Sequence, residues 1–132
     1  MGSWDPKIES ADSALLLQGA LLRRLIDFDT HDQLAQLEQL FSDEEKQRLA
    51  GLMKVDHHRW HTAVEGLSDD DIVHLIRFFA MAENLPGWEA GADSPVIPLA
   101  KTLRLRGVRL DTPLLKWLRQ VNDNRYLPYG PL

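Results

Sequence analysis

Two histidines at helical spacing form the most chemically suggestive pair in the sequence. His57 and His61 stand four residues apart in a segment predicted to be helical, so both side chains project from one helix face. Two imidazoles in this arrangement can ligate one zinc ion. His58 stands where the zinc-protease motif has its glutamate, and a third ligand would have to come from His74 or the acidic run 69–71. We favour a solvated helix edge here, and the alternative is a site for zinc or another divalent metal, or a metal-dependent enzyme.

Positive charge gathers toward the carboxyl end of the chain. Residues 1–94 hold eight Lys and Arg against eighteen Asp and Glu, whereas residues 95–132 hold seven against two. This basic part either complements the acidic part within one fold, which we favour, or binds phosphate or RNA with tyrosines for stacking. The overall net charge of −5 disfavours binding to nucleic acid. The residues predicted to bind a partner or an anion are Trp88, Lys101, Arg104, Arg109, Lys116, Arg119, Arg125, Tyr126 and Tyr129.

Other patterns that indicate catalysis are missing from the sequence. It contains no GxGxxG, GxxxxGK[ST] or GxSxG string. The absence of cysteine excludes thiol nucleophiles, disulfides, thiolate zinc sites and iron–sulfur clusters. Several serines directly precede predicted helices, where a hydroxyl acts as a cap. The sequence therefore favours a protein that is not an enzyme and predicts no cofactor.

The elements that would carry these residues are helices. An apolar residue followed by Ser, Thr or Asp marks a helix entry, because it supplies the hydrophobic position and the cap. Such entries occur at Phe28-Asp29-Thr30, Phe41-Ser42-Asp43, Leu67-Ser68-Asp69 and Leu110-Asp111-Thr112. No segment alternates with a period of two, so we expect no sheet. The expected helices cover about 6–26, 31–41, 43–54, 57–66, 69–83, 95–106 and 113–122.

The helix expected near 69–83 should be the central one. Its polar side chains His74 and Arg77 form a narrow stripe, and apolar residues occupy nearly all the rest of its circumference. We therefore expect an all-α fold, a compact bundle of about seven short helices, with those at 31–41, 95–106 and 113–122 packed around this one. The similar entries at Phe41 and Leu67 leave a helical-repeat arrangement as a minority alternative.

Length and composition predict one domain. The chain has 132 residues, 44% of them hydrophobic and 27% charged, which is typical of a single globular unit. We place the domain at 1–122 and treat 123–132 as an aromatic and proline-rich tail, docked on the domain or, alternatively, on a partner. No uncharged apolar run reaches the ~18 residues that a membrane helix needs. The first residues lack the pattern of a secretory signal, so we expect a cytoplasmic location and no contact with a membrane.

These observations favour a helical domain that binds another protein. The contact region would comprise the loop that carries Trp88, the basic face and the aromatic tail, because exposed Trp, Tyr and Arg supply much of the energy of interfaces. Self-association into a homodimer is a further hypothesis. It depends on the leucine-rich first helix, whose apolar residues cover more than one narrow face.

Overall fold

The structure, a computed structural model, describes residues 17–127. These residues form seven α-helices and three short 3-10 helices, and they contain no strand. The prediction of an all-α fold is therefore confirmed. The α-helices are α2 (Gly19–Thr30), α3 (Leu37–Leu40), α4 (Asp43–Leu49), α5 (His57–Ala63), α6 (Asp69–Ala82), α7 (Val96–Leu105) and α8 (Thr112–Val121). The 3-10 helices are η1 (Leu34–Gln36), η2 (Ala50–Lys54) and η3 (Gly91–Asp93).

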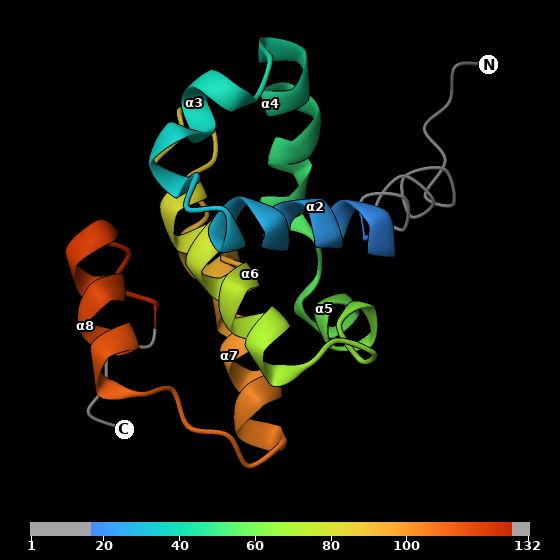
Figure 1. Cartoon of the computed structure of the whole chain (residues 1–132), viewed down its shortest axis with the longest axis vertical. Coiled ribbons are helices and arrows are strands. Elements are labelled where there is room, and N and C mark those ends of the chain that lie inside the picture. The colour runs from blue at the N-terminus through green and yellow to red at the C-terminus, as the bar shows by residue number, and fades with distance from the viewer. Residues whose placement is uncertain (1–16, 128–132) are drawn as a thin grey trace.

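Helix α6 is the central element, as its apolar circumference predicts. In Figure 1 it runs through the middle of the molecule, with α2 crossing it and α8 standing to the left. The helices α2, α7 and α8 all contact α6, and α5 packs against α7. The buried side chains of α6 are Ile72, Leu75, Ile76, Phe78, Phe79, Ala80 and Ala82, all without exposed surface. The core thus surrounds α6 on most sides.

Three predicted helix entries have the expected cap chemistry. The hydroxyls of Ser42 and Ser68 each accept a hydrogen bond from the backbone N–H three residues later, and each forms a full capping box. The Asp111 carboxylate accepts from the backbone N–H of Leu114 at 2.8 Å. These side chains satisfy amide groups that the first turn of a helix leaves without a partner.

The fourth predicted entry is wrong. Helix α2 continues through Phe28 and Asp29 and ends at Thr30, and the residues expected to form one helix over 31–41 are a turn, η1 and α3. Asp29 is not a cap, because its carboxylate accepts hydrogen bonds from His74 Nδ1 at 2.7 Å and from Arg77 Nε at 2.9 Å. The Asp29 carboxylate thus pairs with side chains of α6 and does not cap a helix.

The packing around α6 also differs from expectation at the amino-terminal side. Helix α2, rather than a helix at 31–41, makes the most extensive contact with α6. Its side chains Leu22, Leu25 and Ile26 are fully buried there. The leucine-rich helix that suggested a homodimer therefore uses these three residues inside the domain.

The first part of the tail, residues 123–127, lies against the domain. The Asn124 side chain donates to the carboxylate of Glu83 and to the carbonyl of Gly91, both at 2.9 Å. Leu127 is buried with 4% of its surface exposed. The expected helical residues 6–16 and the predicted contact residue Tyr129 lie outside the described part of the chain.

Candidate functional site

A cleft of about 980 Å³ lies between α7, the connection over residues 106–111 and the start of α8. We call it the α7–α8 cleft. Its volume is at the upper end of the range typical of ligand sites. Its lining combines apolar side chains with two arginines and one tyrosine: Ile97, Ala100, Arg104, Val108, Arg109, Leu110, Asp111, Thr112, Leu115 and Tyr126.

The turn at the end of α7 shapes one wall of the cleft. The N–H of Gly107 donates to the carbonyl of Arg104 at 3.0 Å, and the N–H of Val108 donates to that of Leu103 at 2.9 Å. Together these bonds form a Schellman motif. Gly107 has φ of +81°, a left-handed conformation that favours glycine. The reversal of the chain at this glycine places Val108 and Leu110 in the lining of the cleft.

The cleft carries a surplus of positive charge. Arg104 and Arg109 are exposed, and neither guanidinium group makes an ion pair with any of residues 17–127. Asp111 is the one carboxylate that the described residues contribute to the lining. Its Oδ1 already accepts from the N–H of Leu114, so it is committed to capping α8. Two arginines therefore face solvent beside an apolar surface.

An exposed tyrosine completes the rim. Tyr126 lines the cleft and keeps 50% of its surface exposed. The guanidinium group of Arg125 lies 5.2 Å from the centroid of its ring, within the range of a cation–π contact. Lys101 is exposed one turn before Arg104 on α7. The structure thus brings Arg104, Arg109 and Tyr126 to one cleft and holds Arg125 next to it.

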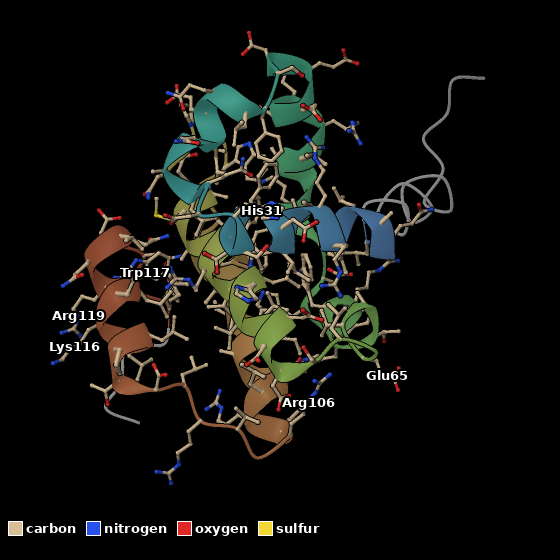
Figure 2. The ribbon with its side chains drawn as sticks, in the orientation of Figure 1. His31, Glu65, Arg106, Lys116, Trp117 and Arg119 are labelled. Atoms are coloured by element: carbon tan, nitrogen blue, oxygen red, sulfur yellow. The ribbon has the colours of Figure 1, made fainter. Side chains whose placement is uncertain are left out.

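Lys116 and Arg119 occupy a different surface. Figure 2 shows both side chains on the outer side of α8, pointing away from α6 and α7. Neither residue lines the cleft. Arg106, which is also labelled in Figure 2, donates hydrogen bonds to the carbonyls of Val64 and Leu67 and to the carboxylate of Asp69. It thereby connects the end of α7 to the segment between α5 and α6. Lys116 and Arg119 of α8 therefore lie on a different surface from Arg104 and Arg109.

Trp88 belongs to the core. Only 1% of its surface is exposed, and its ring stacks on Phe41 with centroids 6.0 Å apart. Its indole N–H donates to the carbonyl of Lys46 at 3.1 Å. We therefore leave Trp88 out of the candidate contact surface, although its loop composition had placed it there.

Two of the predicted metal ligands, His61 and His74, have separate partners, whereas the buried Nε2 of His57 has no hydrogen-bond partner in the described part of the chain. The Thr102 hydroxyl donates to the carbonyl of Pro98 at 2.9 Å, so its oxygen must accept from Nδ1 of His61, 2.6 Å away. His74 is bound to Asp29 on the other side of α6. Within residues 17–127, no group of three or more His, Cys, Asp or Glu side chains is arranged to hold a metal ion. The structure thus does not bring His57, His61 and His74 to one site.

His61 makes the stability of the protein dependent on pH. Burial lowers the pKa of His61 below its ordinary value of 6.5, and the positive charges of Lys101, His57 and His58 lower this pKa further. Its stabilising contribution is fully present above pH 6.5. As the pH falls below 6.5 the unfolded chain takes up a proton first, so this contribution is lost as the pH passes through the lower pKa of the folded state.

We expect the melting temperature to fall between pH 7.5 and pH 5.5, and the fall to be smaller for His61→Asn. Asparagine retains an N–H donor for Thr102 but does not titrate. The matched control is His31→Asn, since His31 lies exposed at the end of α2 (Figure 2). An equal fall for wild type and His61→Asn, measured by thermal denaturation, would contradict this assignment.

Sequence reasoning missed the apolar lining of the cleft. The spacing of apolar residues in α8 predicts that Leu115 lies in the core. The sequence predicts that Leu110 is the hydrophobic residue before a helix cap. In the structure, Leu110 is half-buried and lines the cleft together with Ile97 and Val108. No signal in the sequence indicates that a cleft separates α7 from the start of α8, because its shape depends on the path of the connection between them.

Comparison with known proteins gives no match to any family model, any curated protein or any solved structure. Within the described residues, no helix has the length and apolar character that crossing a membrane requires.

Proposed function

We propose that this chain is a non-enzymatic domain that binds another protein and receives a segment of that partner in the α7–α8 cleft. The single observation that supports this most is the combination of a cleft of about 980 Å³, a largely apolar lining and two exposed arginines at its edge. An apolar centre with a polar rim is the usual anatomy of a protein interface.

The chemistry of the lining favours binding over catalysis. General acid or base work needs a titratable group free to move a proton to or from a substrate. The carboxylate in the lining, that of Asp111, uses its Oδ1 to cap α8 through the N–H of Leu114 at 2.8 Å. An arginine side chain offers five N–H donors and no acceptor, so Arg104 and Arg109 can bind and orient a partner. Arg and Tyr are residue types enriched at the energetic centres of interfaces.

The alternative functions receive less support. A metal site on His57 and His61 would need a third ligand from His74 or the acidic run 69–71, and within residues 17–127 no group of three or more His, Cys, Asp or Glu side chains is arranged to hold a metal ion. A phosphate or RNA site on both basic helices would need the charges of α7 and α8 on one face, whereas Lys116 and Arg119 point away from α7 (Figure 2).

The proposal is tested by panning a random-peptide library against the immobilised full chain and against two variants. Ile97→Trp places a larger side chain at the half-buried edge of the cleft and should abolish peptide binding. Leu40→Trp is the matched control, because Leu40 is 39% exposed on α3, far from the cleft in Figure 1. It should leave binding unchanged. The melting temperature of each variant verifies that it is folded.

Two results would overturn the proposal. One is that panning enriches no peptide family that binds wild type with a measurable Kd. The other is that every enriched peptide binds Ile97→Trp as tightly as it binds wild type.

A further inference from the structure

We infer that the partner segment for the α7–α8 cleft is acidic, with carboxylates flanking the apolar side chains that enter the cleft. This inference rests on the proposed function and names the chemistry of the partner.

The two cleft arginines lack the carboxylate partners that four other arginines of this chain have. Carboxylates bind the guanidinium groups of four arginines at 2.8 to 3.1 Å, in the pairs Arg23–Asp71, Arg24–Glu45, Arg77–Asp29 and Arg106–Asp69. The chain contains 20 Asp and Glu against 15 Lys and Arg, so carboxylates are in excess. Arg104 and Arg109 nevertheless pair with none of those in residues 17–127. A bound carboxylate could accept two parallel hydrogen bonds from one of these arginines, as Asp71 does from Arg23.

The charge in the lining of the cleft is locally positive. Arg104 and Arg109 stand there with one carboxylate, that of Asp111, whose Oδ1 caps α8. The remainder of the chain is acidic, with a net charge of −10 over residues 1–94. A positive cleft on an acidic molecule attracts a locally acidic segment and repels basic ones.

The cleft suits an acidic peptide better than a nucleic acid. A phosphodiester backbone gains most of its affinity from many cationic contacts along its length. The cleft offers two arginines above apolar side chains such as Val108 and Leu110, and the acidic part of the molecule would repel an extended polyanion. An acidic peptide places its carboxylates on the rim and its apolar side chains on this surface, so it satisfies both parts of the cleft.

The test uses the peptide enriched most strongly by panning, labelled with a fluorophore, and measures its Kd by fluorescence polarisation. The enriched peptides should contain Asp or Glu next to apolar residues. Replacing each acidic residue by its amide should weaken binding, and raising the salt concentration from 50 to 300 mM should do the same. The variant Arg104→Glu/Arg109→Glu should weaken binding by about tenfold or more, because each exposed pair contributes roughly two- to fivefold and reversal adds repulsion.

Two controls separate charge from folding. Arg48→Glu carries a charge reversal on the exposed face of α4, at the opposite end of the molecule in Figure 1, and should leave the Kd unchanged. Arg104→Gln/Arg109→Gln removes both charges without placing a carboxylate at the end of α7, where it would oppose the helix dipole. This second variant should weaken binding less than the double reversal does.

The possible failures can be told apart. Peptides that require Ile97 but carry no acidic residues, or that bind the double reversal as tightly as wild type, overturn this inference and leave the proposed function standing. An oligouridylate that binds more tightly than the peptides, and loses binding in the double reversal, overturns it in favour of a nucleic acid. If no peptide depends on Ile97, both the inference and the proposed function fail.

Discussion

Replacement of Phe79 by alanine should lower the free energy of unfolding by about 3–5 kcal/mol, the usual cost of removing a buried phenylalanine. Phe79 has no exposed surface and lies in the last turn of α6. Its ring meets Phe78 and Trp60 edge to face, with centroid distances of 5.0 and 5.2 Å. Such aromatic contacts add to the energy of burial itself.

The size of the effect follows from the position of Phe79 in a continuous aromatic core. Phe78 contacts Phe41 at 6.3 Å between centroids, and Phe41 stacks on Trp88 at 6.0 Å. A cavity at Phe79 therefore opens where α5 meets α6 and separates Trp60 from the rest of this row of rings. The surrounding side chains are close-packed and can relax only partly into the space.

Urea denaturation followed by circular dichroism measures this loss. Domains of this size have only about 5–15 kcal/mol of stability, so the loss expected for Phe79→Ala is a large part of the total. Phe79→Leu is therefore used as a second variant. It retains most of the side-chain volume and should lower the free energy of unfolding by about 1 kcal/mol. A loss below about 1 kcal/mol for Phe79→Ala would mean that Phe79 does not lie in the packed core.

Replacement of Glu83 by alanine should lower the free energy of unfolding by about 3 kcal/mol or more, because each buried donor left without an acceptor costs roughly 1–3 kcal/mol. Glu83 is 6% exposed and follows the end of α6. Its carboxylate accepts from Ser94 at 2.9 Å, from Asn122 at 3.2 Å and from Asn124 at 2.9 Å. One side chain thus joins the end of α6 to the residues before α7 and after α8.

Alanine at this position would leave three donors without their acceptor. The second hydrogen of each amide is already used, since Asn122 also donates to the carbonyl of Ala80 and Asn124 to that of Gly91. Glu83→Gln should have an intermediate effect, because one amide oxygen replaces two carboxylate oxygens while the new NH₂ group faces other donors. Glu89→Ala, at an exposed position in the loop before η3, is the control and should change stability by less than about 0.5 kcal/mol.

The pH dependence of the same variants provides a second test. Burial raises the pKa of Glu83 above its ordinary value of 4.5, against the opposing effect of hydrogen bonds from Asn124, Ser94 and Asn122. Its stabilising contribution is therefore fully present below pH 4.5 and is lost as the pH rises through the pKa of the folded state. The free energy of unfolding of wild type should exceed that of Glu83→Gln by less and less as the pH rises through the pKa of Glu83 in the folded state. An advantage that grows with pH would contradict the assignment.

The sequence by itself determined the helical class, the central helix and most helix entries. Ser42, Ser68 and Asp111 cap their helices as predicted, because a cap depends on atoms within three or four residues of it. Helix α6 is central because its composition leaves only a narrow stripe for water. Gly107 ends α7 in a left-handed conformation, which depends on the type of this one residue.

The tertiary structure alone decided where the long-range partners lie. Asp29 has the local sequence of a cap, yet it binds His74 and Arg77, which are more than 40 residues away. Trp88 stands in a loop with many turn-forming residues, yet it fills a space between Phe41 and the carbonyl of Lys46. The α7–α8 cleft depends on how two helices and their connection diverge. Local patterns report on neighbours along the chain, whereas burial, ion pairing and clefts depend on which distant segments meet.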